Sequence, residues 1–350
     1  MAKKPAQGNV YLIGAGPGDP GLMTLKGRDL IAQADCLVYD ALAAPAMLAW
    51  VKPDCEKIYV GKRAGNHALP QEQINDLLVS CAARYACTVR LKGGDPYVFG
   101  RGGEEALALQ KAGVHFEVVP GVSSAIAGPA CAGIPVTHRD CCTQFTVFTG
   151  HEGVNKSGPA LDIEGIASAK GTKVMLMGMS RLRETLAALV QAGQKADTPA
   201  AAIQWAATGR QKCVTATVAT LAEAVEQKGI SSPAVVVIGD VVALAPMLDW
   251  RSRLPLCGKR IVVTRTREQA SELSSQLYRL GADVMELPTI RISDPTDKRD
   301  FAEAVVDAPH YDWLIFSSPN GVKRFFQAFF AVYEDIREIG GARIAAVGLY

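Results

Sequence analysis

The chain has 350 residues, of which 49% are hydrophobic and 21% are charged, a balance typical of globular proteins that excludes global disorder. Its 37 lysines and arginines against 35 aspartates and glutamates give a formal net charge of +2, which does not favour nucleic acid or an acidic membrane surface as a partner. No apolar run reaches about 18 residues, and the polar segment before Asn9 has no hydrophobic signal core. We therefore expect a cytoplasmic protein of about two to three domains.

The nine cysteines agree with a reducing compartment. None of them forms a C-x-x-C pair, and none stands with histidine at the spacing of zinc ligands. We predict free thiols that are mostly buried, and no metal site.

The first part of the chain alternates predicted strands with predicted helices. The strands are expected at residues 10–13, 36–39, 88–91 and 116–119, and the helices at 22–34, 71–83 and 103–112. Strands that alternate with helices are typical of a parallel sheet in an α/β fold.

The alternation then starts again, and later a third time. Further strands are expected at 145–149, 173–177, 200–204 and 234–238, with helices at 182–191 and 220–227, and then strands at 260–264, 282–287, 313–316 and 343–347 with a helix at 268–280. We divide the chain into lobes 9–130 and 131–245, a linker 246–257 and a third part 258–350. Because the last strand has no covering helix after it, we expect the third part to be an incomplete domain.

The first predicted strand runs into the loop GAGPGD, from Gly14 to Asp19. This loop is similar to the dinucleotide fingerprint G-x-G-x-x-G, but Asp19 stands where the third glycine would be and would repel a pyrophosphate. We predict a loop that binds an adenosyl ligand rather than NAD, with a plain tight turn as the alternative.

The third predicted strand runs into RLKGGDPYVFGRGGEE, residues 90–105. Ligands bind at the carboxyl ends of strands in open α/β sheets, and Gly93 and Gly94 allow the backbone to approach a ligand. Asp95 is expected to accept hydrogen bonds from ribose hydroxyls or an amine. The nearby basic residues are expected to bind carboxylates, and a solvated loop is the alternative.

Two shorter segments indicate an anionic substrate less specifically. The loop VGKRAGNH, residues 60–67, is small, basic and rich in glycine, and THRD, residues 137–140, offers Arg139 to a carboxylate. Taken alone, each agrees as well with a solvated loop.

Together the motifs resemble the uroporphyrinogen-III C-methyltransferases of the tetrapyrrole methylase superfamily. The resemblance covers nearly all of residues 9–250, through VYLIGAGPGDPGLMTLKG, VYD, VGKR, VRLKGGDPYVFGRGGEE, EVVPGVSSAIAGPACAGIPVTHRD, MLMGM, ATGRQ and PAVVVIGDVV. It implies a two-lobed α/β tetrapyrrole methylase fold with S-adenosylmethionine (SAM) between the lobes. The implied reaction is methylation of uroporphyrinogen III at C-2 and C-7 to precorrin-2, on the way to sirohaem or cobalamin. A homodimer acting on a small-molecule tetrapyrrole is implied, with no nucleic acid or membrane as partner.

The resemblance also implies roles for single residues. Asp40 matches the proton acceptor, and Lys62 matches the proton donor, although we slightly favour Lys62 as a residue that orients a substrate carboxylate. Contacts to SAM are implied at Pro17, Gly93, Gly94, Asp95, Val98, Ser123, Ser124, Met177 and Ala206. Candidates to bind the carboxylates of the substrate are Arg63, Arg90, Lys92, Arg101, His138 and Arg139. Ala206, Ser124 and Cys131 depart from the residues common in the family, and Cys131 puts the packing near the substrate in doubt.

The third part resembles the N-terminal portion of uroporphyrinogen-III synthase, through KRIVVTRTREQASEL, LGADVMELPTI, YDWLIFSSPNGV and RIAAVG. We expect it to be too short for synthase activity, and we expect a chain that ends at Leu256 to keep methyl transfer. Two alternatives stay open: a SAM-dependent methylase of another tetrapyrrole or of RNA, and a tetrapyrrole-binding module without activity. No basic stripe interleaved with aromatic residues supports RNA.

Overall fold

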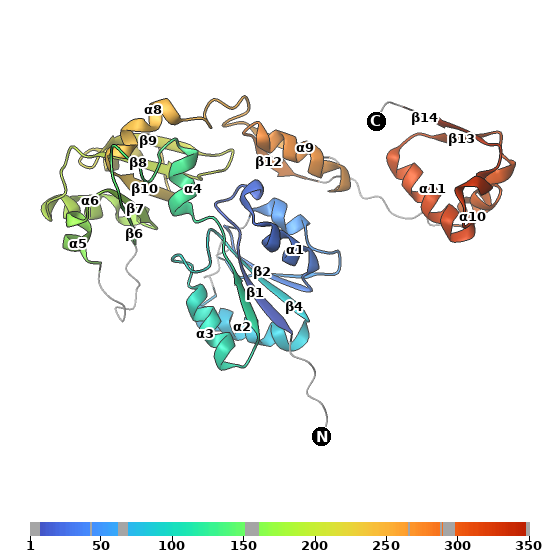
Figure 1. Ribbon diagram of the computed structural model, residues 1–350, viewed down its shortest axis with the longest axis horizontal. Helices are drawn as coiled ribbons and strands as arrows, with labels where there is room; N and C mark the ends of the chain where they lie inside the picture. Colours follow the sequence, from blue (N-terminus) through green and yellow to red (C-terminus); the bar gives the residue numbers. More distant parts are fainter. Residues whose placement is uncertain are drawn as a thin grey trace, which may run out of the picture. The chain divides into compact units, whose positions relative to one another are not determined.

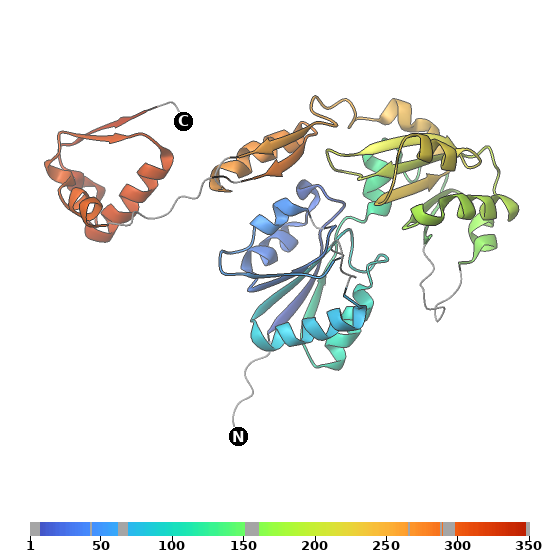
Figure 2. The same cartoon turned by 180° about the vertical axis from the view of Figure 1, so that it is seen from behind.

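The structure is a computed structural model that describes residues 8–42, 44–61, 69–150, 161–264, 267–287, 289 and 298–347. The chain divides into two compact units, Met1–Thr289 and Ile290–Tyr350. Figures 1 and 2 show the arrangement of helices and strands inside each unit. The predicted α/β fold is confirmed, because helices pack on both faces of the two large sheets of the first unit.

The first large sheet has five parallel strands in the order β3-β2-β4-β1-β5 (Figure 1). They are β1 (Asn9–Gly14), β2 (Cys36–Tyr39), β3 (Glu56–Tyr59), β4 (Cys87–Lys92) and β5 (Phe116–Val119). The helices of this lobe are α1 (Leu25–Gln33), α2 (Gln71–Arg84) and α3 (Gly102–Lys111), with the 3-10 turns η1 (Pro20–Leu22) and η2 (Pro45–Ala49). Helices α2 and α3 cover one face of the sheet, and α1 with η2 covers the other.

The sequence dictates these elements locally. Helix α1 begins after Thr24, whose hydroxyl accepts a hydrogen bond from the amide of Gly27 at 3.1 Å. Helix α2 buries Ile74, Leu78 and Cys81, which recur at the helical period and form its core face. Strand β3, which was not predicted, has only charged and half-buried positions, as expected of a strand at the edge of a sheet.

The second large sheet is mixed, in the order β6-β7-β10-β8-β9. Its strands are β6 (Phe145–Thr149), β7 (Thr172–Leu176), β8 (Pro199–Gln204), β9 (Lys212–Thr217) and β10 (Ala234–Ile238). Only β6 and β7 pair in parallel, while the other three pairings are antiparallel. The repeated alternation of strands and helices did not reveal these antiparallel pairings. Strand β9 was missed, and it returns directly from β8 through the loop of residues 205–211, which needs no crossover helix.

Helices cover both faces of the second sheet as well. One face carries α5 (Ile163–Ser168), α6 (Leu182–Gln191) and α7 (Leu221–Gln227), and the other carries α4 (Ser124–Cys131), η4 (Asp240–Leu244) and α8 (Ala245–Leu248). Helix α4 precedes the lobe boundary predicted at residue 131, yet it packs against β7 and β10 of the second sheet. The boundary itself stays a prediction.

The first unit ends in a small parallel pair of strands with one helix. These elements are β11 (Arg260–Val263), α9 (Arg267–Arg279) and β12 (Asp283–Glu286). They agree with the strands and the helix predicted after the linker, to within one or two residues at each end.

The second unit has its own small core. It contains α10 (Arg299–Val306), β13 (Trp313–Phe316), α11 (Pro319–Val332) and β14 (Arg343–Ala346), with the 3-10 turns η5 (Ala308–His310) and η6 (Ile336–Ile339). Strands β13 and β14 pair in parallel, as a crossover helix between them requires. Its core centres on Phe325 and Phe329 of α11, a helix that the sequence analysis did not predict.

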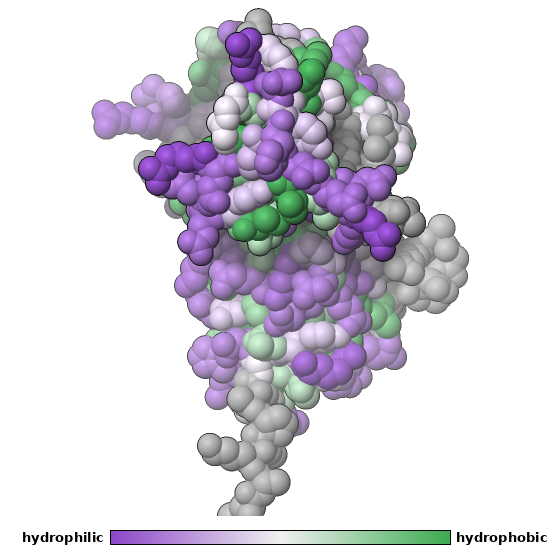
Figure 3. Space-filling model, turned by 90° about the vertical axis from the view of Figure 1, so that its right-hand side faces the viewer, coloured by the Kyte–Doolittle hydropathy of each residue, from purple (hydrophilic) through white to green (hydrophobic). Residues whose placement is uncertain are grey.

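The surface carries few features of its own. The face shown in Figure 3 is mostly hydrophilic, with apolar side chains in small separate patches. Over the described ranges, none of the helices has both the length and the apolar character needed to cross a membrane.

All nine cysteines are free, but only Cys36, Cys55, Cys81 and Cys131 are buried, so burial is less general than predicted.

Candidate functional site

A cavity of about 700 Å³ opens where the two large sheets of the first unit meet. On the first sheet it is lined by the loops that follow β1, β2 and β4, at the carboxyl ends of parallel strands, where ligands bind in such folds. On the other side it is lined by the start of α4 and by the loops after β7 and β8. Cavities of this size, about 300–1,000 Å³, are typical of small-molecule sites.

Two glycine-rich loops pair through their backbones and form the floor of the cavity. The amide of Gly16 donates to the carbonyl of Gly94 at 3.1 Å, and the amide of Gly94 donates to the carbonyl of Gly16 at 2.7 Å. Both residues have left-handed φ angles, +71° and +66°, which glycine adopts without strain. The two predicted ligand loops, GAGPGD and GGD, therefore form one platform that presents peptide groups to the cavity.

Two aspartates shape these loops. The carboxylate of Asp95 accepts hydrogen bonds from the amides of Tyr97 at 2.8 Å and Gly121 at 3.0 Å, so the contacts in the structure fix the loop. Its predicted bond to a ribose or an amine stays a prediction. Asp19 accepts from the amide of Gly21 at 2.8 Å and lines the cavity, which keeps a negative charge where a dinucleotide would place its phosphates.

The backbone is strained around the cavity. Among the described residues, five non-glycine residues have left-handed φ angles between 48° and 63°, and all five line the cavity: Phe99, Arg101, Met177, Trp205 and Ala207. Such residues are uncommon and cluster at ligand sites, where the surrounding structure holds them. Their convergence supports the cavity as the candidate functional site, independently of any sequence motif.

A buried ionic cluster, made of Asp40, Arg90, Lys92 and Glu105, lies beside the floor. Glu105 is fully buried, and its Oε1 accepts from Arg90 Nε at 3.2 Å and from Lys92 Nζ at 2.9 Å. Arg90 also reaches Asp40 Oδ2 with Nη2 at 3.3 Å, while Asp40 Oδ1 accepts from the amide of Leu42 at 3.1 Å. The side chain of Asp40 is 26% exposed, which makes it the most accessible member.

The cluster changes the interpretation of its two cations. Arg90 and Lys92 line the cavity as predicted for substrate binding, but their side chains are only 4% and 5% exposed. Their charges are compensated inside the protein by Glu105 and Asp40. Burial, followed by the nearby Arg90, holds the pKa of the Lys92 amine below its usual value. Glu105 was not predicted as their partner. The alternation of side chains along β4 does place Arg90 and Lys92 on one face of the strand, where both contact this one carboxylate.

The other predicted residues divide into two groups. The cavity is lined by Pro17, Gly93, Gly94, Val98, Arg101, Ser123, Ser124, Met177 and Ala206. Arg101 is 57% exposed and makes a bidentate pair with Glu104, at 2.8 and 2.7 Å. His138 and Arg139 lie in a turn that does not line the cavity, and the backbone of His138 forms an isolated β-bridge with that of Cys142. Lys62 and Arg63 lie outside the described residues.

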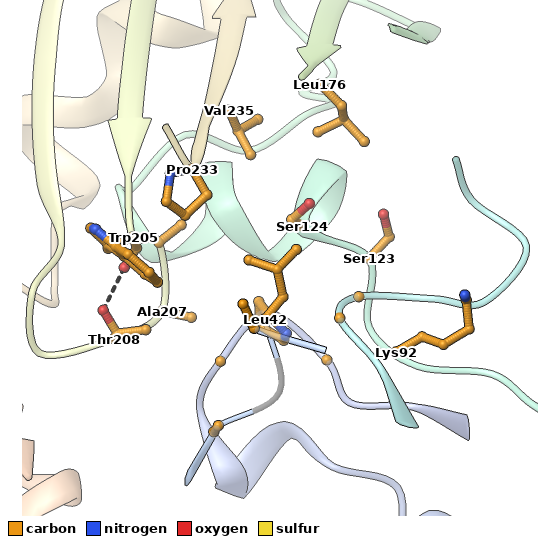
Figure 4. A pocket seen from close by; sticks show the side chains of 18 of the residues that line it. Leu42, Lys92, Ser123, Ser124, Leu176, Trp205, Ala207, Thr208, Pro233 and Val235 are labelled. Atoms are coloured by element: carbon orange, nitrogen blue, oxygen red, sulfur yellow. Dashed lines mark hydrogen bonds between the residues drawn. The ribbon is translucent and has the colours of Figure 1, made fainter. Parts of the chain in front are cut away.

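The loop of residues 205–211, between β8 and β9, contributes side chains that the sequence analysis did not predict. The guanidinium of Arg210 stacks on the ring of Trp205 at 3.8 Å, and Thr208 Oγ1 donates to the carbonyl of Trp205 at 2.7 Å (Figure 4). In that view Leu42, from the loop after β2, lies between Trp205 on one side and Lys92 on the other. Both lobes therefore supply the walls of the cavity.

The fold and the site define a two-lobed α/β protein with a cavity of small-molecule size between its lobes. The sequence profile of the tetrapyrrole (corrin/porphyrin) methylases matches residues 9–222, and that of uroporphyrinogen-III synthase HemD matches residues 271–349. The chain belongs to the tetrapyrrole methylase family, with a HemD-like domain behind the methylase part.

Three relatives illustrate the similarity. A uroporphyrinogen-III C-methyltransferase of Bacillus subtilis is 40% identical over 339 residues, which are 97% of this chain and 69% of the relative. A SAM-dependent uroporphyrinogen III methyltransferase of Methanosarcina barkeri is 48% identical over 241 residues, 69% of this chain and 94% of the relative. The crystal structure of uroporphyrin-III C-methyl transferase from Thermus thermophilus, complexed with S-adenyl homocysteine, is 39% identical with a TM-score of 0.59, and the match covers 68% of this chain and all of that chain.

Proposed function

We propose that this chain transfers methyl groups from SAM to C-2 and C-7 of uroporphyrinogen III, giving precorrin-2. The observation that carries the proposal is the convergence of the strained, glycine-floored cavity with the charged side chain of Asp40 at its edge. Relatives with the same named activity match the whole methylase part of the chain.

The residues of the cavity fit SAM. The amides of Gly16 and Gly94 already bond each other's carbonyls, so hydrogen bonds to the amino acid and the ribose of SAM would come from the neighbouring peptide groups of these loops and from the start of α4, after Ser123. Apolar contacts come from Pro17, Val98 and Met177. When bound, SAM supplies a methyl group activated on a sulfonium sulfur. The walls of the cavity would hold that methyl group in line with the reacting carbon, because positioning the two reactants lowers the barrier.

We assign proton removal from the tetrapyrrole to Asp40. The carboxylate follows β2 at the carboxyl end of the sheet, one oxygen held by the Leu42 amide and the other by Arg90. This double attachment fixes its orientation and leaves the side chain 26% exposed toward the cavity. A base that is held in place and still accessible meets the geometric requirement for general base catalysis. Lys62 keeps its proposed role as proton donor or carboxylate anchor.

Binding of the substrate carboxylates is assigned first to Arg101. Its guanidinium lies at the rim of the cavity, is 57% exposed, and can exchange Glu104 for a substrate carboxylate in the same bidentate geometry. Arg63, His138 and Arg139 remain further candidates. Arg90 and Lys92 act in this scheme through Asp40 and Glu105.

The resemblance supports three further proposals. The protein acts as a homodimer in the cytoplasm, its product serves sirohaem or cobalamin synthesis, and neither nucleic acid nor membrane is a partner. We also retain the division into lobes 9–130 and 131–245, a linker 246–257 and a synthase-like part 258–350.

The test is an anaerobic incubation of the chain with SAM and uroporphyrinogen III, read by the mass of the product. A gain of two methyl groups supports the proposal. A chain that binds S-adenosylhomocysteine (SAH) but transfers no methyl group would contradict the assigned substrate and keep the cofactor site. A chain that binds neither SAM nor SAH would contradict the proposal as a whole.

A further inference from the structure

The HemD-like part begins against the wall of the methylase cavity. We call residues 258–287, which contain β11, α9 and β12, the docking segment. A Cβ placed on Gly209 would lie 2.0 Å from the amide nitrogen of Asp283 and 2.2 Å from the carbonyl carbon of Ala282. Backbone therefore packs directly on backbone, and only glycine at position 209 permits this approach. Tyr278 and Asp283 of the docking segment are themselves among the residues that line the cavity.

An ion pair also connects the docking segment with the loop of residues 205–211. Asp283 Oδ1 lies 3.5 Å from Arg210 Nε, and Asp283 Oδ2 lies 2.7 Å from Arg260 Nε on the neighbouring strand. The Asp283 side chain is 19% exposed, so the pair with Arg210 is partly shielded from water. Because Arg210 also stacks on Trp205, a continuous set of contacts runs from β12 of the docking segment to the wall of the cavity.

The wall needs such support because its backbone is strained. Trp205 and Ala207 have φ angles of 48° and 63°, and Ala206, implied as a SAM contact, lies between them. Left-handed non-glycine residues persist only where their surroundings hold them. From the linker, the buried Arg251 donates to the carbonyl of Ala207 at 3.2 Å, so two successive parts of the chain behind the methylase lobes brace this one loop.

We propose that Asp283 of the docking segment is a positioning residue for the methyl-donor site, which holds Arg210, Trp205 and the loop around Ala206 in their ligand-binding conformation. The inference rests on the proposed function in one respect, since it takes the occupant of the cavity to be SAM or SAH. It assigns to a residue of the HemD-like part an influence on the affinity of the methylase part.

The experiment measures the affinity of the full chain for SAH by calorimetry, with no tetrapyrrole present. Asp283→Asn keeps the size of the side chain and removes its charge. We expect it to weaken SAH binding about two- to fivefold, the effect expected from a partly exposed ion pair. Arg260→Gln removes the other partner of Asp283 and leaves Arg210 in place, and Glu272→Gln neutralises an exposed carboxylate on α9 of the same segment. Both controls are expected to bind SAH as the unchanged chain does.

A second measurement separates positioning from general destabilisation. Trp205 fluorescence, taken as the difference between each protein and its Trp205→Phe variant, is expected to change with Asp283→Asn and not with Arg260→Gln. The thermal midpoint is expected to fall equally little in both. A double-variant cycle tests whether Arg210 and Asp283 act together. The combined variant, Arg210→Ala with Asp283→Asn, is expected to raise the SAH dissociation constant by less than the product of the fold-changes of the two single variants.

Three results would overturn the inference while the proposed function stands: unchanged SAH affinity in Asp283→Asn, an equal loss in Arg260→Gln, or fully multiplicative effects in the cycle. If the unchanged chain binds no SAH, both the inference and the proposed cofactor site are wrong. If the unchanged chain transfers methyl groups and its Asp283→Asn variant binds SAH normally, the inference is wrong and the proposed function stands.

Discussion

Replacing Glu105 with glutamine tests the buried ionic cluster of Asp40, Arg90, Lys92 and Glu105. The substitution keeps the shape of the side chain and removes the negative charge that Arg90 Nε and Lys92 Nζ share at 3.2 and 2.9 Å. Removing one partner of a buried ion pair costs about 3–5 kcal/mol, because the remaining charge is left in a medium of low polarity. Lys92 can release its proton and so avoid part of this loss of stability. We therefore expect a loss at the lower end of the range, about 3 kcal/mol. A loss of this size lowers the thermal midpoint by about 6–12 °C in a unit of this size.

The pH dependence of the loss follows from Lys92. Burial already lowers the pKa of its amine, and loss of Glu105 lowers that pKa further. Between this lowered pKa and the ordinary value of 10.5, the unfolded chain binds more protons than the folded chain, so stability rises with pH. The deficit of Glu105→Gln relative to the unchanged chain is therefore expected to shrink as the pH is raised from 7 to about 9.

Differential scanning calorimetry at both pH values measures these effects. Glu104→Gln is the matched control, since Glu104 precedes Glu105 on α3 but is 51% exposed and pairs only with Arg101 in the contacts described. We expect it to cost less than about 1 kcal/mol. Lys92→Met combined with Glu105→Gln removes the unpaired charge and should recover most of the midpoint. A loss no larger than that of Glu104→Gln, or one that grows with pH, would refute the argument.

Three further predictions concern the site and the first lobe. Asp40→Ala should lower turnover about 10²–10⁴-fold while SAH still binds, and loss of SAH binding in calorimetry would move Asp40 into the cofactor site instead. Asp95→Ala releases the amides of Tyr97 and Gly121 and should weaken SAH binding about tenfold or more, so an unchanged dissociation constant would reject its role in the loop. The hydrogen bond from Lys52, with that from the Cys87 amide, holds the pKa of Asp35 below its usual 3.8, so its stabilisation is complete above that pH and is lost as the pH falls through the lowered value. Asp35→Asn should flatten the fall of the thermal midpoint in acid, and an unchanged slope would contradict this assignment.

The elements with strong periodicity were predictable from the sequence. Strands β2, β5, β6 and β10 and helix α6 coincide with their predicted bounds, because short runs rich in β-branched and aromatic residues, and helical periodicity in α6, have few other interpretations. Strand direction was not predictable, since β8 and β10 are equally apolar whether their neighbours run parallel or antiparallel. Helix α4 was missed because Gly128 and Pro129 interrupt its pattern, although Ser123 caps it with a side-chain bond to Ala125.

The loops of the site were more predictable than its charges. GAGPGD and GGD identified the floor of the cavity because glycine adopts the left-handed φ angles of Gly16 and Gly94 without strain. Arg90 and Lys92 were predicted to meet substrate carboxylates, but the sequence does not say which acid will face them across the fold. Glu105 does so from α3, whereas its neighbour Glu104 points to Arg101. Trp205 and Arg210 were missed because the motif ATGRQ, residues 207–211, does not indicate the left-handed backbone of this loop.

The buried ionic cluster also links proton transfer to substrate binding. With Asp40 and Glu105 ionised, their charges balance those of Arg90 and Lys92, and the cluster presents no net charge to the carboxylates of the proposed substrate. When Asp40 accepts a proton, the balance is lost and the cluster becomes positive beside the cavity. Because Arg90 and Lys92 are almost fully buried, water screens this charge poorly. The proton transfer that we assign to Asp40 therefore strengthens the attraction for the anionic substrate at the moment its ring loses a proton.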